Sequence, residues 1–412
     1  MKKLSVCMIV KNEEPVLRRC LDCVAQFADE LIVVDTGSTD RSVEIAREYT
    51  PHVYLHPWQN SFAEARNYSY SNATGDYIMW LDADEVVSDE NIKKINAFKQ
   101  ETTDADAIYM ITKFYSESGI TSYFLRDRII HRTAFRVWCG DVHEAIPIEP
   151  WRKKIYRSDI EILHKKEVVN EPERNMNIFN RMIYEGKPLS LQENKNLIAE
   201  LSQHGKAEEA LALFRKISSS LPTSSYAYAF THLMVELQRA ERWSECLELI
   251  EEAEKHIVPT PRMLYAKGVC MNNLGKAEAA EKLYHMALAA REDPLTMSTC
   301  YTGYNDYFPY LRLAELAKMR GNMQEAMRFM NCAISAYPKD INWKITQLGI
   351  MLNIENLSKN VKEKKTMAKS EKELNELKQE IDKVTEKLKE LSAEELEKIT
   401  GGGGYSSGTP HY

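Results

Sequence analysis

Short apolar runs alternate with helical segments over residues 1–165, and this alternation constrains the fold more than any other feature. The runs have strand length and are LSVCMIV (4–10), LIVVD (31–35), VYLH (53–56) and DYIMWLDAD (76–84). Segments with helical spacing lie between the first three. Strands that are buried on both faces and separated by helices form a mostly parallel sheet covered on two sides. The pattern therefore predicts an α/β nucleotide-binding domain.

An internal repeat occupies the region predicted to be helical, residues 190–358. Three stretches align and a fourth is a degenerate copy: HGKAEEALALFRKI, LGKAEAAEKLYHMAL, RGNMQEAMRFMNCAI and AERWSECLELIEEA. The aligned positions Gly205, Glu241, Gly275 and Gly321 lie 36, 34 and 46 residues apart. The first two spacings match the tetratricopeptide (TPR) period, whose signature is Gly between paired helices followed by a crowded Ala. The region resembles a TPR array with an aromatic insertion; an unrelated helical bundle is the alternative.

The C-terminal segment, residues 359–412, is rich in Lys and Glu. Its apolar residues follow helical spacing, which predicts an amphipathic helix or hairpin that ends at four glycines. LSAEELEKITGG resembles the end of a double-glycine leader of a bacteriocin precursor. No cysteine follows Cys332, so a fused acceptor would use a hydroxyl group of Ser406, Ser407 or Thr409. A solvated helix with a flexible end is the alternative.

Composition argues against several other functions. The net charge of -7 gives no basis for binding nucleic acid, which needs a basic face. No apolar stretch has the length of a membrane span. The eight cysteines are scattered, which is typical of a reduced cytoplasmic protein. We expect a boundary at residue 165, a linker over residues 166–189, and surplus helical surface that would suit a homodimer.

The motif WLDADE places two carboxylates, Asp82 and Asp84, at the end of the fourth apolar run. Ligands of open α/β sheets bind at the carboxyl ends of the strands. A nucleotide diphosphate is bound together with a hard divalent cation, which one or two carboxylates can hold. The alternative interpretation of the Asp-x-Asp triplet is an exposed acidic turn without a ligand.

The order LSVCMIVKNEE, LIVVDTGSTDRSVEIA and SFAEARNYSYSNATGDYIMWLDADE closely resembles glycosyltransferase family 2, which has the GT-A fold. The resemblance implies a UDP-sugar donor and Mg²⁺ or Mn²⁺. It also implies donor contacts from Asn12, Glu13, Asp35, Arg66 and Asp82, and a metal contact from Asp84. In the family pattern Asn12 and Glu13 lie beside the nucleoside, and Asp35 touches uracil or ribose. Arg66 touches the base or the diphosphate, and Asp82 holds the ribose or the sugar.

The motif WCGDVHEAI offers three candidates for a catalytic base: Asp141, His143 and Glu144. Direct displacement at the anomeric carbon inverts its configuration and needs a base for the acceptor proton. In an extended segment, His143 and Glu144 point in opposite directions. The resemblance to a G-x-x-H-E motif implies Glu144 as the base, with Asp141 in reserve, and a structural salt bridge is the alternative for either. It also implies that His164, in IEILHKK, completes the metal or diphosphate shell unless it is structural.

Together, the transferase-like domain, the repeats and the leader-like tail resemble glycocin glycosyltransferases, which glycosylate Cys or Ser of antimicrobial peptides. The resemblance implies an inverting enzyme that acts on a bacteriocin-like peptide. A transferase for cell-wall or lipid-linked glycans is the second hypothesis. A TPR adaptor with an inactive transferase domain is the third, and the intact Asp35, Asp82 and Asp84 argue against it.

Overall fold

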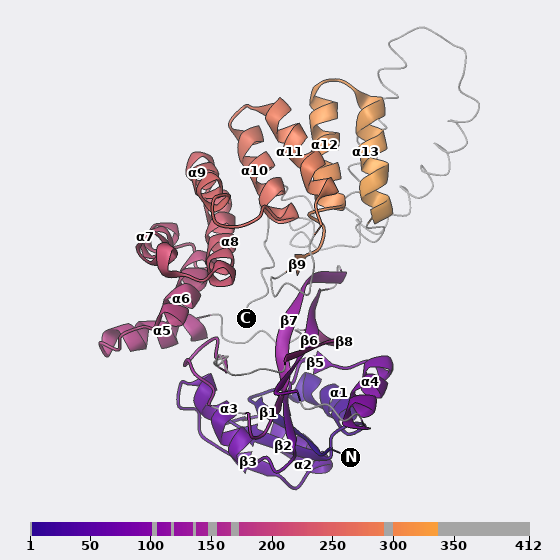
Figure 1. Cartoon of the computed structure of the whole chain (residues 1–412), viewed down its shortest axis with the longest axis vertical. Helices are drawn as coiled ribbons and strands as arrows, with labels where there is room; N and C mark the ends of the chain where they lie inside the picture. Colours follow the sequence, from indigo (N-terminus) through magenta and orange to yellow (C-terminus); the bar gives the residue numbers. More distant parts are fainter. Residues whose placement is uncertain are drawn as a thin grey trace, which may run out of the picture.

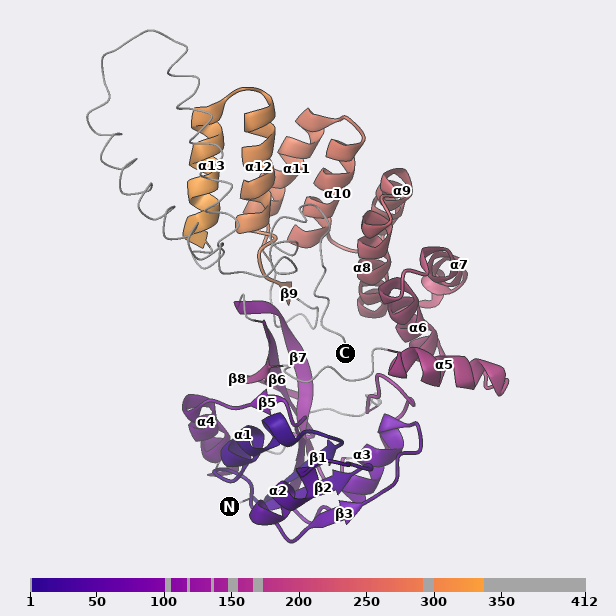
Figure 2. The same cartoon turned by 180° about the vertical axis from the view of Figure 1, so that it is seen from behind.

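The computed structural model describes residues 2–100, 105–116, 119–134, 137–146, 155–165, 173–291 and 300–336. They form an α/β domain followed by an array of helix pairs that extends away from it (Figure 1). The view from behind shows the long strand β7 reaching from the domain toward the array (Figure 2). The predicted C-terminal helix and Gly-rich tail, residues 359–412, lie outside the described residues.

The first half of the sheet is parallel, as predicted, in the order β3-β2-β1-β4. Its strands are β1 (Leu4–Val10), β2 (Glu30–Asp35), β3 (Val53–Leu55) and β4 (Tyr77–Trp80). Alternate residues of β1 face opposite layers: Val6 and Met8 pack in the core with helices α1 (Glu14–Val24) and α2 (Ser42–Tyr49), whereas Cys7 packs with α3 (Phe62–Ser71). The predicted two-sided cover is therefore confirmed.

The second half of the sheet is mixed. It contains β5 (Glu85–Val86), β6 (Ala107–Ser116), β7 (Gly119–His131) and β8 (Ile155–Lys165), with α4 (Asp89–Gln100) between β5 and β6. Strand β7 runs antiparallel to β4 and β6, and β5 runs antiparallel to β8. The prediction of a mostly parallel sheet is wrong here, because β6 and β7 follow each other closely in the chain, and strands joined by a short connection pair antiparallel.

The helical region confirms the predicted TPR-like repeats. Its paired helices are α6 (Leu191–Gln203) and α7 (Ala207–Ile217), α8 (Thr223–Arg239) and α9 (Trp243–Ala253), α10 (Pro261–Asn273) and α11 (Ala277–Ala289), and α12 (Tyr307–Met319) and α13 (Met323–Ala336). The aligned residue between each pair has a positive φ: 74° at Gly205, 55° at Glu241, 78° at Gly275 and 77° at Gly321. None of the described helices is long and apolar enough to cross a membrane.

The segment expected to be a linker, residues 166–189, contains helix α5 (Arg174–Tyr184). Met176, Phe179 and Met182 lie on one face of α5 and are buried in the core of the first helix pairs. Because this face is apolar at helical spacing, residues 174–184 belong to the repeat core rather than to a flexible connection.

Several contacts hold the repeats against the α/β domain, and two of them lie on either side of the space between these parts. Strand β9 (Cys300–Tyr301), from the aromatic insertion before α12, pairs antiparallel with β7. On the opposite side, the Asp141 carboxylate accepts a hydrogen bond of 2.8 Å from Lys187 Nζ, which follows α5. The two domains therefore enclose the space between these connections.

Candidate active site

The loops after β1 and β2 are bonded to each other at the carboxyl edge of the sheet. Asn12 has a positive φ of 56°, and its Oδ1 accepts a bond of 2.7 Å from the Thr39 backbone N–H. The Asp35 carboxylate is buried and accepts the N–H groups of Gly37 and Ser38, both at 3.0 Å. The structure thus brings Asn12 and Asp35 to one edge, where backbone contacts fix the orientation of both side chains.

Strand pairing between β5 and β8 completes an acidic cluster beyond β4. Asp82 and Asp84 follow β4 directly, and the register places Glu85 opposite His164. His164 Nε2 lies 3.3 Å from Asp84 Oδ2. Donor atoms of Asp82, Glu85 and His164 all lie within 4.8 Å of one another. The predicted metal residues Asp84 and His164, far apart in the sequence, are therefore neighbours.

The carboxylates of this cluster, and the nearby Glu13, are close enough to oppose one another's ionisation. Burial, with Asp84 and then Asp82, raises the pKa of Glu13 to about 7. Burial also raises the pKa of Asp84 to about 6, although His164 acts in the opposite direction. Oxygen donors with one imidazole are ligands that a divalent cation such as Mg²⁺ or Mn²⁺ accepts, and a cation would relieve this repulsion. The residues present fit a divalent metal.

A buried ion pair beneath the cluster was not anticipated from the sequence. Glu85 and Arg128 are fully buried; Arg128 Nη1 donates to Glu85 Oε2 at 2.8 Å, and Nη2 donates to Oε1. Burial opposes ionisation, but Arg128 and His164 hold the pKa of Glu85 below its ordinary range. Because both Glu85 oxygens are engaged, Asp84 is the more available ligand. The only sequence signal was an arginine within the apolar strand FLRDRII.

Arg66 connects the acidic cluster to the candidate base. Its Nη2 donates to Asp82 Oδ1 at 2.8 Å and its Nε to Glu144 Oε1 at 2.6 Å. The guanidinium lies 4.6 Å from the ring centre of Trp80 and 5.3 Å from that of Trp138. Nη1 is buried and has no hydrogen-bond partner among the residues that the structure describes. Arg66 is thus a fixed cation with one unused donor between two acidic side chains.

The three candidate bases have different partners. Burial raises the pKa of Asp141, but Lys187 and Ser61 outweigh it and hold the pKa below its ordinary value. His143 has a φ of 51°, so this segment is not extended, and its Nε2 lies 2.7 Å from Glu200 Oε1 on α6. Glu144 instead faces Arg66. Of the two carboxylates, Asp141 is engaged in joining the domains, whereas Glu144 lines a cavity.

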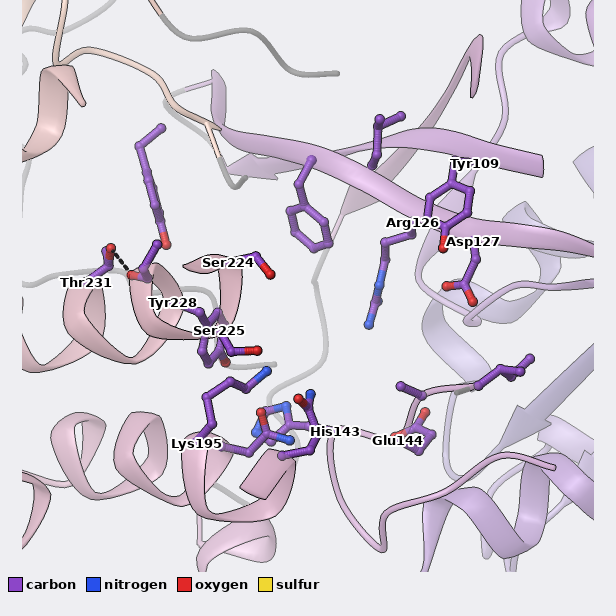
Figure 3. Close-up of a pocket in the computed structure, with 18 of the residues that line it drawn as sticks. Tyr109, Arg126, Asp127, His143, Glu144, Lys195, Ser224, Ser225, Tyr228 and Thr231 are labelled. Atoms are coloured by element: carbon purple, nitrogen blue, oxygen red, sulfur yellow. Dashed lines mark hydrogen bonds between the residues drawn. The ribbon is translucent and has the colours of Figure 1, made fainter. Parts of the chain in front are cut away.

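A cavity of about 400 Å³ lies between the α/β domain and the repeats. Its walls come from β7, from the segment that carries His143 and Glu144, and from helices α6 and α8 (Figure 3). Aromatic side chains that line it include Trp80, Phe124, Trp138, Tyr228 and Tyr301. Glu144 therefore lies at the contact between the donor-side cluster and a space that both domains form.

Comparison with known proteins agrees with this architecture. Residues 5–158 match the model of glycosyl transferase family 2. The SPbeta prophage-derived glycosyltransferase SunS of Bacillus subtilis is 31% identical over 149 residues, which cover 33% of each chain. A TPR repeat-containing protein of Synechococcus elongatus is 48% identical over 85 residues, or 21% of each chain. The matches therefore span only about a fifth to a third of these curated relatives.

Among solved structures, S. aureus TarS 1–349 in complex with UDP-GlcNAc is 16% identical, with a TM-score of 0.32. That alignment covers 69% of this chain and 92% of the other. The family match falls on the α/β domain, whose strand order and acidic cluster are described above. Residues 5–158, which include most of the α/β domain, therefore match glycosyl transferase family 2, and TPR-like helical repeats follow them in the chain.

Proposed function

We propose that this chain is an inverting, metal-dependent enzyme that transfers a sugar from a UDP-sugar to a Cys or Ser side chain of a bacteriocin-like peptide in the cytoplasm. The observation that carries the proposal is the chain of contacts from Asp82 through Arg66 to Glu144, at the wall of a cavity between two domains. It provides a donor side, a candidate base and room for an acceptor in one place.

On the donor side, Asp84 and His164 hold the cation, and Asp82 holds the ribose or the sugar. A bound Mg²⁺ or Mn²⁺ supplies positive charge to the leaving diphosphate. In this proposal Asn12, Glu13 and Asp35 bind the nucleoside, and their positions at or just after the ends of β1 and β2 support this role. The unused Nη1 donor of Arg66 supports a contact with the diphosphate.

On the acceptor side, Glu144 is the general base. The acceptor oxygen or sulfur attacks the anomeric carbon as the bond from that carbon to the diphosphate breaks, and Glu144 takes the acceptor proton. A single displacement inverts the configuration. Burial disfavours the charged form of Arg66, but Asp82 and Glu144 raise its pKa, so Arg66 stays protonated. A thiol acceptor needs less help, because it is partly ionised near neutral pH.

A peptide acceptor is supported by the two-domain cavity and by the leader-like sequence of residues 359–412. In this proposal the repeats position the peptide, and Ser406, Ser407 and Thr409 are candidate acceptors within the chain itself. Tethering would raise the effective concentration of such an acceptor to roughly millimolar, so weak affinity would suffice.

The proposal is tested by incubating the full chain with a panel of UDP-sugars, Mn²⁺ and synthetic Cys- or Ser-containing peptides, and weighing both peptide and protein. A hexose or N-acetylhexosamine added to the peptide is expected with at least one donor. Removing the metal with a chelator is expected to stop transfer, and Mn²⁺ is expected to restore it. Transfer that continues in the chelator would contradict the metal assignment, and transfer only to lipid-linked or cell-wall glycans would contradict the peptide assignment.

A further inference from the structure

We infer that the cavity between β7 and the repeats binds a carboxylate of the acceptor peptide, from an acidic residue next to the residue that receives the sugar. The inference rests on the proposed peptide transfer and adds a substrate preference to it. Its basis is the distribution of charge around the cavity, which is lined by the side chains of Arg126, Lys195 and Arg262.

Two of these cations approach the cavity from opposite domains. Arg126 extends from β7 and Lys195 from α6, on either side of the space (Figure 3). Their contacts are aromatic: the Arg126 guanidinium lies 4.8 Å from the Trp80 ring centre, and Lys195 Nζ lies 4.4 Å from that of Tyr228. Within the described ranges, neither cation is paired with a carboxylate.

The positive charge is also partly removed from water. Burial lowers the pKa of Lys195 to about 8, and no neighbouring anion opposes the effect. Burial, followed by Arg262 and His143, lowers the pKa of His232 to about 3, although Glu200 acts in the opposite direction. A cation held in a partly dry cavity without a counterion is unfavourable, and a bound anion would offset this cost.

Within the described residues, the acidic side chains on the cavity lining form no ion pair with Arg126 or Lys195. Glu144 is already bonded to Arg66, so Asp127 is the other carboxylate on the lining. Helix α8 also begins here, with Ser224 and Ser225 at the cavity and no side-chain cap at Pro222. A helix N-terminus favours a negative group. The cavity therefore combines three cationic side chains with the positive end of a 17-residue helix.

The form of the cavity favours a peptide over a phosphodiester polymer. The cations line one cavity of about 400 Å³, near the lower end of the size of ligand pockets. A polymer with phosphates at regular intervals would instead require cations spread along an open surface. Phe124, Tyr228 and Tyr301 add apolar walls that suit peptide side chains.

The test uses synthetic peptides with one central Cys or Ser, flanked either by Asp or by Asn, and the full chain with the active UDP-sugar. We expect the KM for the Asp peptide to be about tenfold lower than that for the Asn peptide. Lys195→Gln is expected to remove this difference, and Arg126→Gln to reduce it. Lys216→Gln, on the exposed face of α7, is the matched control and is expected to keep it. UDP binding is expected to be unchanged in Lys195→Gln.

Reversing the charge provides an independent check. Lys195→Glu is expected to shift the preference from Asp-flanked to Lys-flanked peptides. Equal KM values for the Asp and Asn peptides with the wild-type enzyme would overturn this inference while leaving peptide transfer intact. Failure to modify any peptide, with UDP binding retained, would overturn the proposed function and this inference with it. Preferential modification of a phosphodiester polymer would overturn both as well.

Discussion

Charged side chains are buried in the site at the strand ends, whereas in the outer helices α11–α13 they lie at the surface. The site buries Glu85, Arg128 and Arg66 among carboxylates that raise each other's pKa values. In the described parts of α11–α13, by contrast, the buried side chains are all apolar, and charges pair at the surface, as in Arg312–Glu315. Buried polar groups in the repeats occur only toward α5–α10, which include the helices beside the cavity.

This contrast separates two kinds of stabilisation. The outer helices are held by close apolar packing, since Tyr284 lies so near Gly268 that a Cβ there would come within 2.6 Å of its ring. The site is held by ion pairs and hydrogen bonds, such as those from Arg128 to Glu85 and from Arg66 to Asp82 and Glu144. Substitutions in the site are therefore expected to affect catalysis first, and substitutions in the outer repeats to affect stability alone.

The largest effect is expected from Asp84→Ala. Removing this carboxylate weakens the charge clamp on the diphosphate, which contributes several kcal/mol in the transition state, so transfer is expected to fall by roughly 10³-fold or more. Steady-state kinetics measure the loss, and the Mn²⁺ dependence of UDP binding identifies its cause. Asp159→Ala, whose side chain is 80% exposed, is the matched control. Near-normal turnover of Asp84→Ala would remove this residue from the mechanism.

Glu144→Gln is expected to lower kcat by about 10²- to 10⁴-fold and to leave donor KM nearly unchanged. Glutamine keeps an oxygen that can accept the bond from Arg66 but cannot take the acceptor proton. The comparison variant is Asp141→Asn, which disturbs the contact with Lys187 at the domain junction. If Asp141→Asn caused the larger fall in kcat and Glu144→Gln were silent, the base would be reassigned to Asp141.

Arg128→Leu tests whether buried charge supports the site. It leaves Glu85 buried without its main partner, and breaking such a pair costs about 3–5 kcal/mol of unfolding free energy. The matched pair on the surface is Arg18–Glu48, with side chains 49% and 50% exposed. Arg18→Leu is expected to cost much less, because water screens an exposed pair. Urea unfolding measures both, and equal losses would show that burial does not distinguish these pairs.

A smaller, pH-dependent effect is expected at the junction. Burial raises the pKa of Glu200, but His143 and Asn175 outweigh it, so the folded-state value lies below the ordinary 4.5. As the pH falls, Glu200 is therefore protonated in the unfolded chain at a higher pH than in the folded chain. The stabilisation is fully present above about pH 4.5 and is lost as the pH falls through the folded-state pKa.

Glu200→Gln removes the group that titrates and is expected to flatten this part of the stability profile. Unfolding free energies at several pH values compare it with the wild type and with Glu248→Gln, an exposed control on α9. The stability difference between Glu200→Gln and wild type is expected to shrink as the pH falls. A difference independent of pH would mean that folding does not change the pKa of Glu200, which would contradict this prediction.

The smallest effects are expected at the turns between the paired helices of the repeats. Gly275→Ala is expected to cost about 1 kcal/mol, because an L-residue is strained in the left-handed region. No atom lies within 4 Å of the added Cβ, so the cost is conformational. Glu241→Gly is expected to relieve similar strain, less the backbone entropy that glycine loses. Thermal unfolding measures both, with transfer activity as the control that is expected to stay constant.

Local patterns in the sequence determined much of the architecture. The apolar runs predicted β1, β2, β3 and β4, and the repeat period predicted the turns where Gly205, Gly275 and Gly321 have a positive φ. WLDADE predicted carboxylates beyond the fourth run, which is where Asp82 and Asp84 lie. These features depend on residues near one another in the chain. Over such short distances, the periodicity of apolar side chains and the conformation of glycine determine the local structure directly.

Only the tertiary structure decided which distant charges meet. The β5–β8 register brings His164 to Asp84, and the buried pair Glu85–Arg128 joins residues 43 positions apart. Packing of the helical array brings Lys187 into a hydrogen bond with Asp141. The same packing forms a cavity lined by residues of two domains. A sequence pattern records which faces are apolar, but the partner of a buried charge is chosen by long-range packing. That packing also determines whether a buried charge meets an opposite charge, as at Glu85, or an aromatic ring, as at Lys195.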